Sequence, residues 1–204
     1  MLTLPLLRKM LNRAGTELKA NSKYLCELDS VAGDGDHGIT IGRMADVMKE
    51  KTEDTTIDTM RVLLDELGDA FMGINGGSAG PLWGTVFTGM AEGIDDQAEL
   101  TDLELRKMFT QAKEDFMDIS KAKPGDKTMV DALYPAIDAI IETQGSLKEI
   151  MTAAAAAADA GAEQTSTMVA RFGRAKNMGE RSIGTKDPGA VSIAILFNGM
   201  AKKL

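Results

Sequence analysis

Hydrophobic residues recur at intervals of three and four along most of this chain, the spacing of a helix that buries one face. Five clear periodic runs predict helices over 7–28, 60–74, 101–119, 130–141 and 146–172. Two weaker runs, over 38–50 and 81–94, each follow glycine-rich sequence. Helices are therefore expected to account for almost the whole chain.

Two of the predicted helices carry capping boxes at their starts, in which a hydroxyl residue precedes a glutamate by three positions. Thr101 and Glu104 form one pair, and Ser146 and Glu149 form the other. Pro135 falls inside the 130–141 run, where a proline removes one backbone hydrogen bond and can kink a helix.

The last segment has two interpretations. Asp187 followed by Pro188 is typical of a helix N-terminus, yet the hydrophobic residues beyond it alternate as in a strand. No partner strand is evident elsewhere, so we expect a helix. The total is eight helices with no linker between them, which predicts a single all-α domain over residues 1–204.

Composition narrows the class of protein. The chain is 44% hydrophobic and 26% charged, as in folded globular proteins, and its 14 methionines with only 4% aromatic residues predict an aliphatic core. A net charge of −8 disfavours a nucleic-acid partner. The single cysteine, Cys26, excludes an internal disulfide, and its position within a helix favours a core role over a reactive one.

The hydrophobic stretches are too short to span a bilayer, which takes about 20 residues. No basic residue precedes the apolar run at 2–7, so that run does not resemble a secretory signal. We expect a cytoplasmic protein with no membrane contact.

The residues most suited to binding or catalysis lie in the predicted loops, and the first of these loops spans residues 29–38. Asp29, Asp34 and Asp36 lie within eight residues and repel one another unless a cation joins them. Oxygen ligands favour magnesium or calcium, and the interspersed glycines let the backbone curl around one centre. The alternative is an exposed Asp-Gly turn that caps a helix.

Two known motifs do not fit this loop. Gly33, Gly35 and Gly38 satisfy G-x-G-x-x-G, but the preceding segment has a helical period and the aspartates would repel a bare pyrophosphate. An EF-hand beginning at Asp34 would need glutamate where Ala45 stands. A magnesium ion that bridges to substrate phosphates fits better.

Three further loops add groups that bind phosphates. The 76–81 loop can present main-chain N–H groups and the Ser78 hydroxyl to an anion at a helix N-terminus. The 123–128 loop lacks a Walker A motif, and the 173–189 stretch gathers cations such as Arg174 in an otherwise acidic chain. Taken alone, each could be a packing turn or a solvated face; together they are the parts that phosphoryl transfer requires.

The segments GDGDHG, GGSAGPLWGT, KPGDKTMVDAL, GAEQT and GERSIGTKDPGA make the chain similar to the nucleotide-binding L subunits of dihydroxyacetone kinases. The resemblance spans nearly the whole sequence. It implies an up-and-down barrel of eight antiparallel helices, with ADP or ATP and two magnesium ions in loops at one rim.

The resemblance also assigns roles to individual residues. Asp29, Asp34 and Asp36 match the magnesium ligands. The matched nucleotide contacts are His37, Gly38, Ile39, Thr40, Gly77, Ser78, Ala79, Ser120, Met129, Arg174, Asp187, Pro188 and Gly189. Among these, Met129 is implied on the adenine side, and Ser120 stands where related chains have glycine. We interpret His37 as a nucleotide-site or helix-entry residue and not as a phosphorylated nucleophile.

The resemblance implies a subunit that transfers a phosphoryl group from bound ATP to dihydroxyacetone held on a partner K subunit. A phosphotransferase-system M subunit would then rephosphorylate the ADP in place, and the subunit alone would be inactive. A transcriptional regulator and a second copy of the chain are further partners left open. Two alternatives remain: an ATP-dependent small-sugar or fatty acid kinase subunit, and a nucleotide- or metal-sensing module without catalysis.

Overall fold

The computed structural model describes residues 1–204 and contains nine α-helices, two 3-10 segments, the second of them interrupted at Gly179, and one pair of two-residue strands. The α-helices are α1 (Leu4–Ala20), α2 (Ser22–Asp29), α3 (His37–Glu53), α4 (Met60–Met72), α5 (Ala79–Glu92), α6 (Asp102–Ile119), α7 (Val130–Glu142), α8 (Leu147–Gln164) and α9 (Pro188–Ala201). The 3-10 segments are η1 (Thr165–Thr167) and η2 (Arg174–Ser182), and the strands are β1 (Leu2–Thr3) and β2 (Glu99–Leu100).

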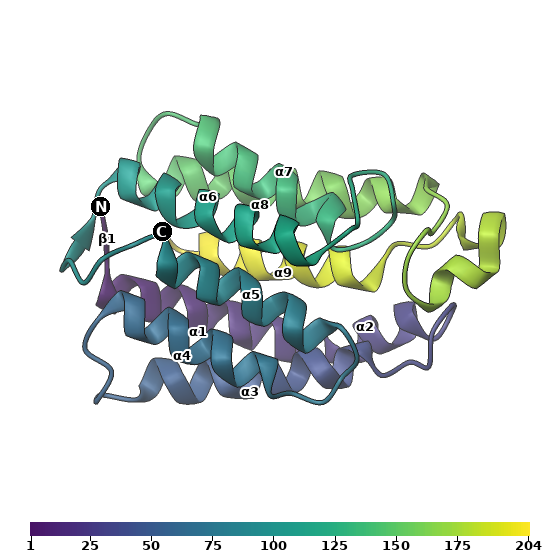
Figure 1. The fold of residues 1–204 in the computed structure, drawn as a ribbon, viewed down its shortest axis with the longest axis horizontal. Coiled ribbons are helices and arrows are strands. Elements are labelled where there is room, and N and C mark those ends of the chain that lie inside the picture. The colour runs from purple at the N-terminus through teal and green to yellow at the C-terminus, as the bar shows by residue number, and fades with distance from the viewer.

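The long helices form a closed ring in chain order, up and down. From α3 to α9 each helix packs against the next one, α1 packs against α3, and α9 returns to pack against α1. Figure 1 shows the helices running side by side along the long axis of the molecule. The predicted all-α up-and-down barrel is therefore confirmed.

The first predicted helix, 7–28, is two helices in the structure. The chain breaks at Asn21, whose side-chain amide donates to the carbonyl of Glu17 at 2.8 Å. The backbone N–H of Asn21 donates to the carbonyls of both Glu17 and Leu18. Such local bonds compete with the regular helical ladder, so the expected eight helices become nine.

The predicted 146–172 helix is too long, because α8 ends at Gln164. The next three residues, Thr165, Ser166 and Thr167, each donate a side-chain hydroxyl bond to the carbonyl three positions earlier. These bonds favour a tight 3-10 turn over a continued α-helix. The chain then crosses the end of the barrel on its way to α9.

The helix starts predicted from capping residues are confirmed. Both capping boxes are present, at Thr101–Glu104 and Ser146–Glu149. The segment after Asp187 is a helix and not a strand, and the Asp187 carboxylate accepts a hydrogen bond from the N–H of Ala190 at 2.7 Å. Helix α7 runs through Pro135 without interruption.

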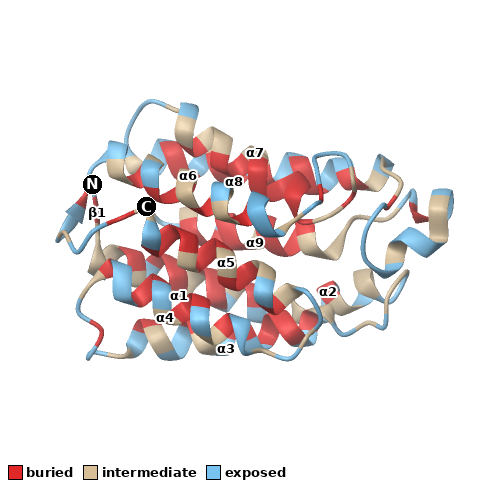
Figure 2. Ribbon diagram, in the orientation of Figure 1, coloured by how far each residue is buried: buried red, intermediate tan, exposed pale blue.

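The core fills the centre of the ring as one continuous cluster of 51 buried hydrophobic residues. Each long helix carries both buried and exposed positions, and Figure 2 shows the buried ones concentrated in the middle of the molecule. The cluster is mainly aliphatic and methionine-containing, with a few aromatic rings such as Phe71 and Phe87, whose centroids are 5.0 Å apart. No helix is long and apolar enough to cross a membrane.

The two ends of the barrel differ. At one end β1 pairs antiparallel with β2, and both chain termini lie there (Figure 1). Arg106 at the same end donates to the carbonyls of Ile140 and Thr143 and so holds the end of α7. At the other end, four connections with little regular structure come together: α2–α3, α4–α5, α6–α7 and α8–α9.

Candidate functional site

The four connections surround a cavity of about 570 Å³, a size typical of small-molecule sites. Four aspartates and four cationic side chains line it, together with apolar residues at its inner wall. The charged residues are Asp29, Asp34, Asp36, Asp187, Lys121, Lys127, Arg174 and Lys186. This mixture can accept both a cation and an anion.

The α2–α3 connection brings its three aspartates together. Ligand oxygens of Asp29, Asp34 and Asp36 all lie within 4.8 Å of one another. Asp29 ends α2, and its carboxylate accepts hydrogen bonds from the N–H groups of Asp36 (3.1 Å) and His37 (3.3 Å). One carboxylate thus organises the loop that presents the other two.

Two glycines are required for this curl. The N–H of Gly33 donates to the carbonyl of Asp29 at 2.6 Å, and a Cβ at Gly33 would lie 2.3 Å from the Asp29 carboxylate. Gly35 has φ +75°, a left-handed conformation that side chains disfavour. Gly33 and Gly35 therefore allow the backbone to fold tightly enough to bring the three carboxylates together.

The acidic loop fits a hard divalent cation. Its three carboxylates supply oxygen ligands, which magnesium prefers, and they are exposed or half-buried at the cavity wall, where further ligands can reach. Arg174, from η2, forms an ion pair with Asp34 across the cavity. The loop therefore faces a cation supplied by the α8–α9 connection.

His37, the first residue of α3, is oriented by α9. Its Nε2 lies 3.2 Å from the Ser192 hydroxyl, which itself donates to the carbonyl of Gly189 at 2.8 Å. Burial lowers the pKa of His37, and the nearby Asp29 carboxylate only partly opposes this effect. A neutral ring bonded to α9 agrees with a helix-entry role.

The α4–α5 connection contributes a small-residue turn before α5. Gly77 has φ +65° with no atom within 4 Å of an added Cβ, so it is open to a ligand. Gly76 packs against α3, since its Cβ would lie 2.2 Å from the hydroxyl of Thr40. The exposed Ser78 and the start of α5 at Ala79 follow, with N-terminal N–H groups that favour an anion.

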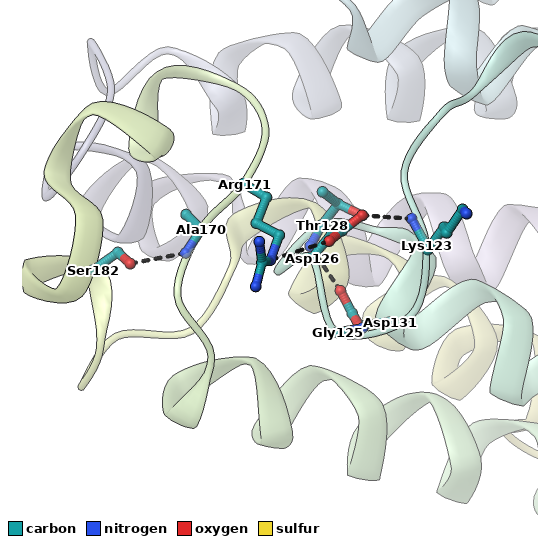
Figure 3. Close-up of polar contacts among 8 residues, drawn as sticks. All are labelled: Lys123, Gly125, Asp126, Thr128, Asp131, Ala170, Arg171 and Ser182. Atoms are coloured by element: carbon teal, nitrogen blue, oxygen red, sulfur yellow. Dashed lines mark hydrogen bonds and ion pairs between the residues drawn. The ribbon is translucent and has the colours of Figure 1, made fainter.

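The α6–α7 connection is folded around two aspartates. The Asp131 carboxylate accepts from the N–H groups of Gly125 (2.5 Å) and Thr128 (2.8 Å). Asp126 accepts from the N–H of Lys123 and lies 3.5 Å from Arg171. Figure 3 shows these contacts, which fix the loop to the segment leading to η2.

Ser182 holds η2 in place. Its hydroxyl accepts from the N–H of Ala170 at 2.9 Å (Figure 3) and donates to the carbonyl of Gly179. Because Ser182 is buried, these bonds are shielded from water. The two ends of the 170–182 segment, which carries Arg174, are thereby held together.

Asp187 caps α9 inside the cavity. Burial raises the pKa of Asp187 to about 7, although the hydrogen bond from the Ala190 N–H favours the charged form. The Asp131 carboxylate raises this pKa further, whereas Lys127 lowers it. Gly189, two residues further on, lies directly against Met129, because a Cβ at Gly189 would be 3.3 Å from the Cβ of Met129.

Most residues proposed from the sequence line this one cavity. They are Asp29, Asp34, Asp36, His37, Gly77, Ser78, Ala79, Ser120, Met129, Arg174, Asp187, Pro188 and Gly189. Gly38, Ile39 and Thr40 do not line it: Gly38 and Thr40 are buried, and Ile39 is 53% exposed. A Cβ at Gly38 would lie 1.8 Å from the carbonyl of Ser22, which makes Gly38 a close contact between α2 and α3.

Several residues that line the cavity are not indicated as site residues by the sequence patterns. The apolar ones include Leu82, Trp83 and Phe116, and the polar ones include Lys127 and Thr185. The apolar residues follow helical periodicity and look like ordinary core positions. Lys127 lies in the Gly-Asp-Lys-Thr turn just before α7. A charged residue at the entrance to a buried helix was the one feature of the sequence that could have indicated its place in the site.

Fold and cavity together define an all-helical protein that presents an acidic loop and opposed cations at one end of its barrel. The DAK2 domain family matches residues 31–202. The chain is 35% identical to the Escherichia coli PEP-dependent dihydroxyacetone kinase, ADP-binding subunit DhaL, over 94% of this chain and 92% of that subunit. This chain therefore belongs to the DAK2 domain family.

The same domain also occurs within longer proteins. The chain is 36% identical to the L-erythrulose kinase of Pectobacterium atrosepticum, covering 95% of this chain and 34% of that enzyme. The crystal structure of the C. freundii dihydroxyacetone kinase in complex with AMP-PNP and Mg²⁺ matches 98% of this chain and 34% of that one. The TM-score of this match is 0.73, at 27% identity.

Proposed function

We propose that this protein is the nucleotide-binding subunit of a phosphotransferase-system-dependent dihydroxyacetone kinase. The observation that carries the proposal is the meeting of three carboxylates, within 4.8 Å of one another, with Arg174 in one cavity. Relatives of similar length that are 35% and 36% identical are named as ADP-binding subunits of such kinases. The domain corresponds to the whole of residues 1–204, and the protein acts in the cytoplasm.

The proposed ligand is ADP or ATP with two magnesium ions. Asp29, Asp34 and Asp36 would hold the metal, which supplies charge neutralisation for the phosphates during transfer. The small-residue turn at Gly77 and Ser78 offers N–H and hydroxyl donors to phosphate oxygens. The base and sugar would lie toward the remaining proposed nucleotide contacts. They are His37, Ala79, Ser120, Met129, Asp187, Pro188 and Gly189, which line the cavity, whereas Gly38, Ile39 and Thr40 would act only by shaping the start of α3.

The chain's own residues then act by position and charge. Arg174 can move between Asp34 and a phosphate oxygen because both it and Asp34 are exposed to solvent. The half-buried, neutral His37 positions the start of α3 and takes no phosphoryl group. The acceptor, dihydroxyacetone, is held by a partner K subunit, and an M subunit returns phosphate to the ADP.

The rim of the cavity is the proposed docking face for these partners. Exposed apolar side chains lie on the connections around it, including Val31, Phe172 and Ile183. An enclosing partner there would exclude water from the transfer, which strengthens every charge interaction in the site. Docking to a transcriptional regulator or a second copy of the chain would use this or another face.

Mass spectrometry of the native protein tests the ligand. We expect a mass increase equal to ADP plus magnesium that survives prolonged dialysis. A chain without nucleotide that also fails to bind added ADP with magnesium would contradict the proposal. With K and M subunits added, dihydroxyacetone should be phosphorylated, whereas the isolated chain with ATP and dihydroxyacetone should show no substantial turnover.

The second candidate is an ATP-dependent kinase subunit for a small sugar or a fatty acid. The 36% identity to an L-erythrulose kinase favours this alternative. The two candidates differ in how they treat the nucleotide, because a cofactor is retained and a substrate exchanges. Rapid loss of ADP on dialysis, with turnover supported by free ATP, would favour the second candidate.

A third candidate is a sensor of nucleotide or metal that binds a transcriptional regulator and catalyses nothing. The Asp34→Ala variant tests whether the protein is a catalytic subunit or a sensor without catalysis. Asp34 is exposed, so its loss should leave the helical core intact. We expect transfer to be abolished in the reconstituted system while the circular dichroism spectrum is unchanged. Persistent transfer would mean that the metal site is wrongly assigned.

A further inference from the structure

Lys127 is a buried cation in the cavity to which the proposed function assigns no role. The residue is only 4% exposed, and its side chain lines the same cavity as Met129 and Asp187. Lysine is almost never buried unless its charge is satisfied. The groups that satisfy it therefore indicate what the side chain does.

The ammonium of Lys127 joins two other segments of the chain. It donates to the carbonyl of Thr165, in the turn that ends α8, at 2.7 Å, and to the carbonyl of Thr185, three residues before the start of α9. The Thr165 hydroxyl in turn accepts from the N–H of Asp187 at 2.9 Å. These bonds connect the α6–α7 loop, the end of α8 and the start of α9.

The backbone conformation of Lys127 indicates that the side chain is needed at this position. Lys127 has φ +60°, and only one other non-glycine residue, Lys203 near the C-terminus, has a positive φ. A left-handed conformation is unfavourable for lysine, and glycine or asparagine would adopt it more readily. Strained residues of this kind cluster at functional sites, where the surrounding structure holds them.

The hydrogen bonds of Lys127 hold together two segments that meet at the cavity wall, where Met129 contacts Gly189. Met129 follows Lys127 by two residues, and Gly189 follows Thr185 by four. A Cβ at Gly189 would lie 3.3 Å from the Cβ of Met129. Because Lys127 ties the two segments together immediately before this contact, its ammonium sets the spacing of the wall that Met129 and Gly189 form.

We propose that Lys127 is a positioning residue for the nucleotide, which holds the Met129 loop against the start of α9 so that the pocket is preformed. This proposal rests on the proposed function, because it assumes that the ligand is a nucleotide. The ammonium acts through the backbone carbonyls of Thr165 and Thr185, so the effect of losing it should fall on nucleotide affinity and leave the acidic loop unchanged.

The test compares Lys127→Gly, Lys127→Arg and the control Lys123→Ala in the full chain. Glycine accepts the positive φ but removes the ammonium, arginine keeps a cation that can bridge two carbonyls, and Lys123 is exposed in the same loop. ADP binding in the presence of magnesium is followed by the fluorescence of the single tryptophan, Trp83, which lines the cavity. Manganese binding without nucleotide, followed by electron paramagnetic resonance, reports on the acidic loop.

We expect Lys127→Gly to raise the Kd for ADP by about tenfold or more, as is usual when a group that orients ligand contacts is lost. Manganese affinity should stay at the wild-type value, Lys127→Arg should recover most of the ADP affinity, and Lys123→Ala should match the wild type. Unchanged ADP binding by Lys127→Gly would overturn the proposal, as would an equal loss of manganese binding.

Folding of the variants is checked separately. If Lys127→Gly does not fold, Lys127→Asn replaces it, since asparagine also tolerates a positive φ. Failure of both variants to fold would make Lys127 a folding residue and overturn the proposal. Absence of ADP binding by the wild-type protein would instead contradict the proposed function, so the two failures are distinguishable.

Discussion

Arg174 forms an ion pair with Asp34, and through it the α8–α9 connection contacts the acidic loop between α2 and α3. The two side chains are 59% and 46% exposed, so the pair adds little to stability. The pair matters for the site, because the Arg174 guanidinium neutralises Asp34, one of the three carboxylates that could bind a metal ion. A cation that binds this loop must compete with Arg174.

This competition predicts opposite effects of Arg174→Ala on two ligands. Without nucleotide, magnesium or manganese should bind more tightly, because the competing guanidinium is gone. ADP should bind more weakly, by about 10- to 150-fold, since a hydrogen bond to a charged group contributes about 1.5–3 kcal/mol. Isothermal titration calorimetry measures both, with Lys176→Ala as the control, because Lys176 is an exposed cation of η2 that does not line the cavity. Parallel changes for metal and ADP would contradict the competition.

The acidic loop predicts a contrast between two of its own residues. Asp29→Ala should lower the free energy of unfolding by about 1 kcal/mol, because two N–H groups lose their acceptor. Asp36→Asn should not lower it, since it removes a like charge and Asp36 makes no side-chain hydrogen bond. Both should weaken manganese binding. Urea unfolding and metal titration test this, with the exposed Asp118→Asn as the control; equal destabilisation by the two variants would count against the loop geometry.

Asp187 predicts a pH dependence of stability in the nucleotide-free protein. Its pKa is about 7 when folded against an ordinary value of 3.8, so the folded state binds the proton more tightly. This contribution to stability is fully present below pH 3.8 and is lost as the pH rises to about 7, with a total on the order of 4 kcal/mol.

Asp187→Asn should remove this dependence while keeping the helix cap, because asparagine caps as well as aspartate. The free energy of unfolding of the variant minus that of the wild type should therefore increase between about pH 4.5 and 7 and then level off. Urea unfolding at a series of pH values measures the difference. A difference that does not change with pH would show that Asp187 ionises normally.

The contact between α7 and α8 predicts a strong effect of a single methyl group. A Cβ at Gly161 would lie 1.9 Å from the carbonyl oxygen of Asp131, so Gly161→Ala should destabilise the protein by about 1–3 kcal/mol or more. Gly42→Ala is the matched control, because its nearest neighbour is at 3.7 Å, and it should be neutral or stabilising by up to about 1 kcal/mol. Thermal unfolding compares the two; a similar midpoint for both would be inconsistent with this packing.

The periodic pattern of hydrophobic residues predicted the helices well, because each long helix buries one face in a shared core. It missed the break at Asn21 and the end of α8 at Gln164, where side chains bond to nearby carbonyls and compete with the helix. Apolar periodicity continues across both places, so the pattern contains no sign of these bonds. Local polar chemistry, not hydrophobicity, decides such boundaries.

The loops were informative for the site because their residue types are unusual. Asp29, Asp34 and Asp36 could be grouped from the sequence, since they are close along the chain. The meeting of Arg174 with Asp34, and of Lys127 with Thr165 and Thr185, depends on which connections share an end of the barrel. That arrangement follows from the closed ring of helices and not from any local motif.

The position of the chain termini at the end with β1 and β2 has a consequence for how this domain can be combined with others. Any polypeptide joined at residue 1 or 204 would extend from the opposite end to the acidic loop (Figure 1). Fusion therefore leaves the mouth of the pocket unobstructed. This geometry is compatible with the relatives, in which the same unit forms nearly the whole of a separate subunit or about one third of a longer kinase.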